Sequence, residues 1–153
     1  MKQEELLQRA QRLCSAREYC VSDIVSRLEQ WGEKDSGSIE KIIKQLIAEK
    51  FIDEVRYCRA FAMDHFKYNR WGRVKIMANL KMKKIPAAAI DSGLNAIDED
   101  EYLKILRIII EADRRSVKAK NRFDQKGKLL RHALARGFES HLVYNVINSL
   151  FED

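Results

Sequence analysis

The stretch that decides the fold runs from residue 51 to residue 85, FIDEVRYCRAFAMDHFKYNRWGRVKIMANLKMKKI. It predicts a helix, a short break at Trp71-Gly72 and a second helix, and Asp53 is a favourable N-cap for the first of them. The apolar residues spaced along one face of the first helix are Tyr57, Ala60, Phe61 and Tyr68. The matching stripe of the second helix consists of Val74, Ile76, Met77 and Leu80.

The composition places this pair of helices in a helical chain. The chain has 153 residues, of which 46% are hydrophobic, and this is enough for one domain with a sizeable core. A single proline and six glycines supply little turn material, which argues against an all-β fold. The net charge of +6 is compatible with a polyanionic or acidic partner.

Compartment follows from cysteine usage and from the lack of long apolar runs. Cys14, Cys20 and Cys58 are odd in number and lack C-x-x-C spacing, which favours a reduced, cytoplasmic setting. No apolar run approaches the roughly 20 residues of a membrane span. Residues 1–13, MKQEELLQRAQRL, predict an amphipathic helix rather than a signal peptide.

Seven further helices are expected around the central pair, three before it and four after it. Ser22 is expected to cap the second helix, Asp98 the long helix that runs to about Ala119, and Asp124 the helix after that. Pro86 suits the first turn of a short helix, and Ser140 is expected to open the last one. The prediction is nine helices and no strand.

These helices fall into three groups of three with a period near 50 residues. A shift of 53 residues places Ile85, Ile90, Leu94 and Ile97 on Phe138, Val143, Ile147 and Leu150. We therefore expect an all-α fold, an elongated and curved tandem array of three three-helix repeats. The expected boundaries are 1–50, 51–98 and 99–153.

Basic residues gather in two regions and are the candidates for binding a partner. Seven Lys or Arg and no acid lie between Lys67 and Lys84, and nine basic residues with one acid lie between Arg114 and Arg136. The alternative is an ordinary solvated helix face, since Glu111 lies four residues from both Arg107 and Arg115. The candidate contact residues are Lys67, Arg70, Arg73, Lys75, Lys104, Arg107, Arg114, Arg115, Lys118, Lys128 and Arg131.

Nothing in the sequence predicts catalysis, a metal site or a cofactor. His65, His132 and His141 are far apart and form no H-E-x-x-H motif, and there is no P-loop. Trp71 beside Arg70 and Arg73 has two interpretations: it could stack on a nucleic-acid base or serve as a packing wedge at the helix break. We expect a binding protein and no enzyme.

Four stretches resemble the RecX family of bacterial regulators. Residues 12–28 resemble its opening L-x-x-R-x-x-S-x-x-E-L-x-x-K-L, and residues 50–62 resemble its G-x-L-D-D-x-R-F-A element. Residues 70–80 resemble R-x-x-G-x-x-x-I-x-x-x-L, and residues 134–143 carry the R-G-F turn. Lys84 stands where the family's second unit usually has Gly. The family-motif residues, to which we assign structural roles, are Asp53, Glu54, Arg56, Tyr57, Phe61, Gly72, Arg136, Gly137 and Phe138.

The resemblance implies a cytoplasmic, non-enzymatic protein that binds the RecA recombinase filament. It implies inhibition of the RecA ATPase and of strand exchange, hence a role in DNA repair, recombination and the SOS response. It also implies weak binding to single- or double-stranded DNA, without a cofactor and as a monomer. Two alternatives stay open. One is a sequence-independent DNA-binding protein with helix-turn-helix-like units, and the other is a scaffold for a different protein partner.

Overall fold

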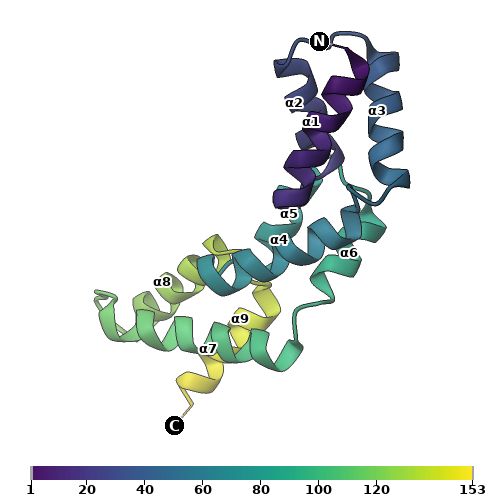
Figure 1. The fold of residues 1–153 in the computed structure, drawn as a ribbon. Helices are drawn as coiled ribbons and strands as arrows, with labels where there is room; N and C mark the ends of the chain where they lie inside the picture. Colours follow the sequence, from purple (N-terminus) through teal and green to yellow (C-terminus); the bar gives the residue numbers. More distant parts are fainter. Residues whose placement is uncertain (1, 153) are drawn as a thin grey trace. The chain divides into compact units, whose positions relative to one another are not determined.

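The computed structural model describes residues 2–152, which form nine α-helices and no strand (Figure 1). The all-α fold of successive three-helix groups predicted from the sequence is therefore confirmed. The helices are α1 Gln3–Ala16, α2 Val21–Gln30, α3 Ser36–Ala48, α4 Glu54–Asn69, α5 Arg73–Met82, α6 Ala87–Leu94, α7 Glu99–Ser116, α8 Arg122–Ala135 and α9 Ser140–Leu150.

Contacts divide the chain into two compact units, and both run through the central pair of helices. The first unit contains the residues up to Phe61 together with Asn79–Gly93. The second contains Ala62–Ala78 and the residues from Leu94 onward. This division describes contact density, and the three repeat boundaries given above stay a prediction.

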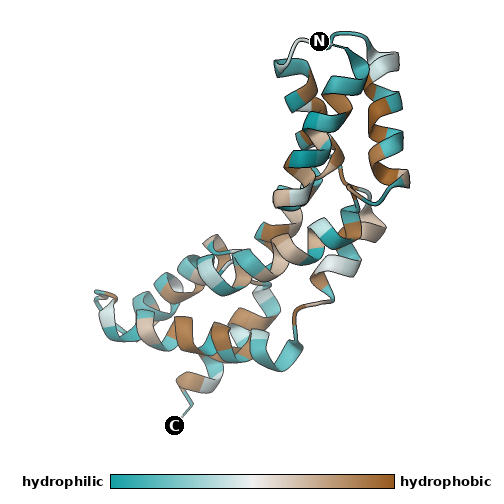
Figure 2. Cartoon of the chain, in the orientation of Figure 1, coloured by the Kyte–Doolittle hydropathy of each residue, from teal (hydrophilic) through white to brown (hydrophobic). Residues whose placement is uncertain are grey.

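The core of the first unit is formed by one face of each of its first three helices. Figure 2 shows alternating apolar and polar bands along the helices, the pattern of amphipathic segments that bury one side. Residues of this core with almost no solvent exposure include Leu6, Ala10, Ile24, Leu28, Ile42 and Leu46.

A second core fills the second unit, and aromatic rings lie at its centre. The rings of Phe66 and Phe138 lie 5.5 and 5.1 Å from the ring of Tyr102, which is fully buried. Aliphatic side chains from α5, α7 and α9 are buried in the same unit, among them Ile76, Leu106, Ile109, Val143 and Ile147.

Of the four side chains expected to cap helices, two do so and two are displaced by neighbouring residues. Asp53 accepts hydrogen bonds from the N–H groups of Val55 and Arg56, and Asp98 accepts one from Glu101. The expectation for Ser22 is wrong, because α2 begins at Val21 and Asp23 bonds back to the N–H of Cys20. Asp124 is likewise displaced as a cap by Asn121, which accepts the N–H of Asp124.

The turn before the last helix of each repeat has the same backbone conformation. Gly32, Lys84 and Gly137 have φ values of 100°, 61° and 96°. Each lies four residues after a fully buried residue of the preceding helix, namely Leu28, Leu80 and Ala133. A left-handed residue at this position ends a helix with satisfied carbonyls, and glycine adopts it without steric cost.

Some apolar residues expected in the core lie at the surface. Tyr68 is 81% exposed, and Ile47, Val74 and Leu134 also retain more than a third of their accessible surface. Ala112 is exposed on α7, and this helix ends at Ser116 rather than near Ala119. The buried stripes are therefore narrower than the periodic pattern alone indicates.

Candidate docking surface of the third repeat

The acidic and basic residues of the 50–62 motif connect segments of the first unit. Half-buried Glu54 accepts the N–H of Val21, the first residue of α2, at 3.2 Å. Arg56 donates to Glu18, and its guanidinium also donates to the carbonyl of Lys50 at 3.1 Å. Lys50 follows α3 in a left-handed conformation, so Arg56 connects the turn after α3 to α4. These residues lie at joints between helices.

A polar network beside this motif surrounds Asp23. The ammonium of Lys83 lies 2.9 Å from the Asp23 carboxylate and 5.8 Å from the centre of the Tyr57 ring. Burial acts to raise the pKa of Asp23, but hydrogen bonds from Lys83 and Cys20 outweigh it and lower the pKa below its usual value. Burial raises the pKa of Glu54 and brings that of Tyr57 to about 12. Tyr57 is therefore a neutral, packed member of the motif.

Phe61 follows Tyr57 on the same side of α4. Its ring centre lies 5.9 Å from that of Tyr57, and its side chain is half-buried. This agrees with the inward position predicted from the spacing, although Phe61 is less enclosed than Tyr57.

The two glycine turns of the family pattern meet backbone to backbone in the second unit. The N–H of Gly72 donates to the carbonyl of Arg136 at 2.8 Å, and the N–H of Val74 donates to the carbonyl of Gly137 at 2.9 Å. A Cβ atom on Gly72 would lie 2.3 Å from the carbonyl carbon of Gly137. Phe138 is buried immediately beyond this contact. The side chain of Arg136 is exposed, and this residue contributes to the contact through its backbone carbonyl.

Arg73, one of the predicted contact residues, is engaged inside the protein. Its guanidinium lies 3.8 Å from the centre of the Tyr102 ring and pairs with Glu99 and Glu139 at 2.8 and 3.1 Å. The Tyr102 hydroxyl accepts the N–H of Arg73 and donates to Glu139. Burial, followed by the hydrogen bond to Glu139, raises the pKa of Tyr102. Arg73 therefore joins α5 to α7 and α9, and we leave it out of the docking surface.

The ring of Trp71 packs against two neighbouring side chains. Its ring stacks on His65 with centres 4.2 Å apart, and the ammonium of Lys75 lies 4.7 Å from its centre. This arrangement favours the packing-wedge interpretation over a ring that is open to a base. Lys75 is half-buried by the same contact, whereas Lys67 and Arg70 are exposed at the end of α4.

Two arginines of α7 are turned toward the end of α9. Arg107 donates to the hydroxyl of Ser149 at 3.2 Å and lies 3.8 Å from Glu111. Arg114 donates to the carbonyl of Leu150 at 2.8 Å and covers the ring of Phe151 at 4.2 Å. A guanidinium near a helix C-terminus satisfies open carbonyls and complements the helix dipole. Arg114 thus has a capping role that its sequence position does not reveal.

Two further basic side chains, which the sequence analysis did not predict as functional, contact Phe151. Arg122 donates to the carbonyl of Phe151, and its guanidinium lies 5.1 Å from the ring centre. The ammonium of Lys126 also lies 5.1 Å from that centre. Their place in a basic stretch was visible in the sequence, but their convergence on one ring at the end of α9 was not.

Four of the predicted residues in the third repeat have exposed side chains that form no hydrogen bond or ion pair with other residues among 2–152. Lys104 and Arg115 are eleven residues apart on α7, a spacing of about three turns that puts them on the same side. Lys118 lies in the turn after α7, and Arg131 lies on α8. We call Lys104, Arg115, Lys118 and Arg131 the α7–α8 basic surface. Lys128 lies beside it, bonded to the carbonyl of Lys118 and 3.4 Å from Asp124.

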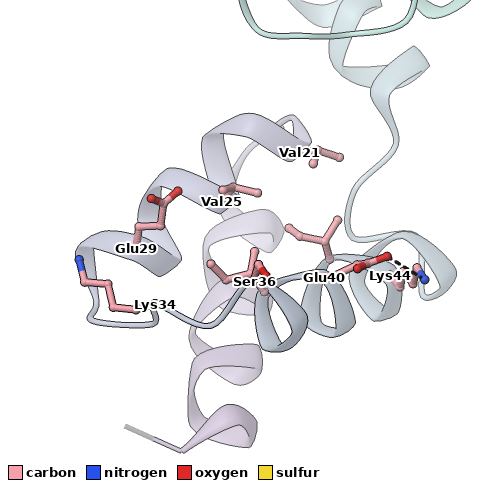
Figure 3. Close-up of a pocket in the computed structure, with 9 residues that line it drawn as sticks. Val21, Val25, Glu29, Lys34, Ser36, Glu40 and Lys44 are labelled. Carbon is pink, nitrogen blue, oxygen red and sulfur yellow. Dashed lines mark ion pairs between the residues drawn. The ribbon is translucent and has the colours of Figure 1, made fainter.

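No metal-binding cluster is found among residues 2–152. No group of three or more His, Cys, Asp or Glu side chains in this part of the chain is placed to hold a metal ion. A groove in the first repeat is lined by apolar side chains of α2 and α3, with the Lys44–Glu40 ion pair at its edge (Figure 3). None of the described helices is long and apolar enough to cross a membrane.

Comparisons with known proteins agree along most of the chain. The family model described as "RecX, second three-helix domain" matches residues 53–94. A regulatory protein RecX from Clostridium tetani is 34% identical over 119 residues, which is 76% of this chain but 54% of that relative. A regulatory protein RecX from Chlorobaculum tepidum is 29% identical over 138 residues and is covered to 83% of its length. The chain thus spans about half the length of the first relative and most of the second.

Solved structures agree in fold. A crystal structure of regulatory protein RecX matches with a TM-score of 0.85 and 21% identity, covering 96% of this chain and 71% of the other. The crystal structure of RecX from Lactobacillus salivarius matches with a TM-score of 0.83 and 18% identity, over 97% and 96% of the two chains. The motif residues, the family model and the relatives lead to the same assignment: over most of its length the chain is similar to regulatory proteins of the RecX family.

Proposed function

We propose that this chain is a cytoplasmic regulator that binds the RecA recombinase filament and inhibits its ATPase and strand exchange, without catalysis of its own. The observation that carries the proposal is the similarity of most of the chain to proteins named regulatory protein RecX. On this view the protein acts as a monomer in DNA repair, recombination and the SOS response, and makes weak contacts with DNA inside the filament.

The α7–α8 basic surface is the proposed point of contact. Exposed Lys and Arg side chains attract phosphates and acidic side chains, and that attraction weakens as salt rises. Arg73 and Arg114 are poor choices for this role because internal hydrogen bonds hold both guanidiniums. Lys67 and Arg70 are a second exposed group within the same unit.

The test is the rate of ATP hydrolysis by RecA on single-stranded DNA, with and without this protein. We expect inhibition at protein levels that cover little of the DNA, and we expect it to weaken as salt rises. The competing function, sequence-independent DNA binding, predicts that inhibition disappears when DNA is in large excess. Inhibition that depends only on the protein-to-DNA ratio would contradict filament binding.

A matched pair of variants locates the contact. Lys104→Glu with Arg115→Glu reverses two charges of the α7–α8 basic surface, and Arg12→Glu with Lys41→Glu makes the same charge change on exposed residues of the first unit. We expect the first pair to lose most inhibition and the second to keep it, with circular dichroism unchanged in both. Equal inhibition by the two pairs would show that the contact lies elsewhere.

A further inference from the structure

The turn between α7 and α8 presents an aromatic ring to solvent. Phe123, in the first turn of α8, is 88% exposed, more than any other large hydrophobic side chain among residues 2–152. Nearby Phe151 is only 6% exposed, although it lies at the end of a helix. Single exposed apolar residues are common on protein surfaces, so the exposure of Phe123 gains meaning only from its surroundings.

Cations surround Phe123 along the chain. Lys120, Arg122 and Lys126 lie within three residues of it, and Lys126 is at the i+3 position, next to Phe123 on the helix surface. The charged groups of Arg122 and Lys126 contact Phe151 at the end of α9. Lys118, a member of the α7–α8 basic surface, precedes Phe123 by five residues. The ring therefore stands among positive charges.

The one acid in this region does not offset these charges at the surface. Asp124 is the only acidic residue between Arg114 and Arg136. Its carboxylate accepts the N–H of Lys120 at 3.0 Å and lies 3.4 Å from the ammonium of Lys128. The Asp124 carboxylate is therefore already engaged with the backbone of the turn and with Lys128.

An exposed ring among Lys and Arg matches the chemistry of single-stranded nucleic acid. The cations can follow the phosphates, and the ring can stack on an unpaired base, which offers its π-face whatever its identity. A duplex offers the phosphates but keeps its bases stacked on one another. An acidic protein surface would use the cations but offers no reason for a ring with 88% of its surface in water.

We infer that the α7–α8 turn is a contact site for single-stranded nucleic acid, in which Phe123 stacks on a base and Lys118 and Lys120 face the phosphates. The inference rests on the DNA contact included in the proposed function and assigns it to a ring that the sequence pattern did not single out.

The test compares two exposed aromatic residues by fluorescence anisotropy. Phe123→Ala removes the ring from its basic surroundings. Tyr144→Ala removes a ring that is 52% exposed on α9, a helix without Lys or Arg. With a labelled 12-nucleotide oligothymidylate at low salt, we expect Phe123→Ala to weaken binding by about 5- to 150-fold, the range for loss of one stacked base, and Tyr144→Ala to change it less than twofold. Phe123→Trp should restore binding.

An abasic strand of the same length separates stacking from charge. It keeps the phosphates and lacks bases, so wild type and Phe123→Ala should bind it with equal, weak affinity. Equal binding of wild type to the abasic and thymidylate strands would overturn the inference, as would unchanged thymidylate binding by Phe123→Ala. A variant that binds the strand normally but no longer inhibits RecA would also overturn it, since the ring would then contact protein.

The same variants keep this inference separate from the proposed function. If Phe123→Ala binds thymidylate normally while wild type inhibits the RecA ATPase, the inference of a stacking site is wrong and the proposed regulatory function is supported. If wild type has no effect on RecA while strand binding depends on Phe123, the regulator is wrong and the stacking site stands. Circular dichroism of Phe123→Ala should match wild type, because the ring makes no buried contact.

Discussion

The backbones of Gly72 and Gly137 touch, and neither position has room for a side chain. A Cβ on Gly72 would lie 2.3 Å from the carbonyl carbon and oxygen of Gly137, and a Cβ on Gly137 would lie 2.3 Å from the Cβ of Lys75. Heavy atoms do not approach so closely in folded proteins, so an added methyl group must push the two turns apart. Two backbone hydrogen bonds, from Gly72 to Arg136 and from Val74 to Gly137, would be strained by that movement.

Gly72→Ala should therefore lower the free energy of unfolding by about 1–3 kcal/mol or more, the cost of overpacking against an immobile backbone. Urea denaturation followed by circular dichroism measures it. Gly127→Ala is the control, because a Cβ there meets only the tip of the Arg131 side chain, at 3.3 Å. As an interior residue of α8, Gly127 should give a protein about 0.5–1 kcal/mol more stable when replaced by Ala. Similar losses from both substitutions would show that the turns can separate easily.

Asp23→Asn should destabilise the first unit at neutral pH by about 1.5–3 kcal/mol, because the Lys83 ammonium loses its charged acceptor. The native pKa of Asp23 lies below its ordinary value of 3.8. The stabilisation is thus fully present above pH 3.8 and is lost as pH falls through the lower, native value. Urea titrations should show the stability difference between wild type and Asp23→Asn shrinking once the pH falls below 3.8. A difference that is constant with pH would exclude the ion pair as its cause.

Lys84→Gly should increase stability by about 0.5–1 kcal/mol. Lys84 has a φ of 61°, a left-handed conformation that costs a residue with a side chain about 1–2 kcal/mol. Glycine removes this cost, but its greater flexibility in the unfolded chain offsets part of the stabilisation. Ala78→Gly, at an exposed position within α5, should instead cost about 0.5–1 kcal/mol. Thermal unfolding of the two variants should move in opposite directions. A loss of stability in both would contradict the backbone explanation.

Tyr102→Phe tests the network around Arg73. The hydroxyl is buried, accepts the N–H of Arg73 and donates to Glu139, so its removal leaves two polar groups short of a partner. We expect a loss of about 1–3 kcal/mol in the free energy of unfolding. Tyr144→Phe removes an exposed hydroxyl and should stay within about 0.5 kcal/mol of wild type. If Tyr102→Phe is equally mild, the network contributes little to stability.

The sequence was sufficient for the helices because their signals are local. Asp53 and Asp98 are caps that act on the next three residues, and apolar spacing within each helix marks its buried side. Ser22 failed as a cap because Cys20 and Asp23 form a competing arrangement in which Cys20, two residues earlier, is the N-cap. Tyr68 failed as a core residue because periodicity shows which side of a helix is apolar but not how far the neighbouring helix extends.

The basic residues show what a sequence leaves open. Arg107 and Arg114 share a helical side with Lys104, and only the position of α9 reveals that both arginines bond to its last turn. Reversing the charge of Arg114 would therefore disturb a helix terminus as well as any docking surface. Phe123 escaped notice for the opposite reason. An isolated phenylalanine in a polar stretch is usually read as a packed residue, and its exposure is a tertiary fact.

The shared position of Gly32, Lys84 and Gly137 bears on how such a chain can change over evolution. If the three repeats descend from one duplicated segment, all three have kept two features at this turn. One is the spacing of four residues from a buried residue of the preceding helix, and the other is the left-handed backbone conformation. The amino acid itself has been free to drift in the second copy, at an energetic cost small enough to tolerate. An insertion or deletion between Leu80 and Lys84 would be far less acceptable than any substitution there, because it would rotate the following helix away from its partners.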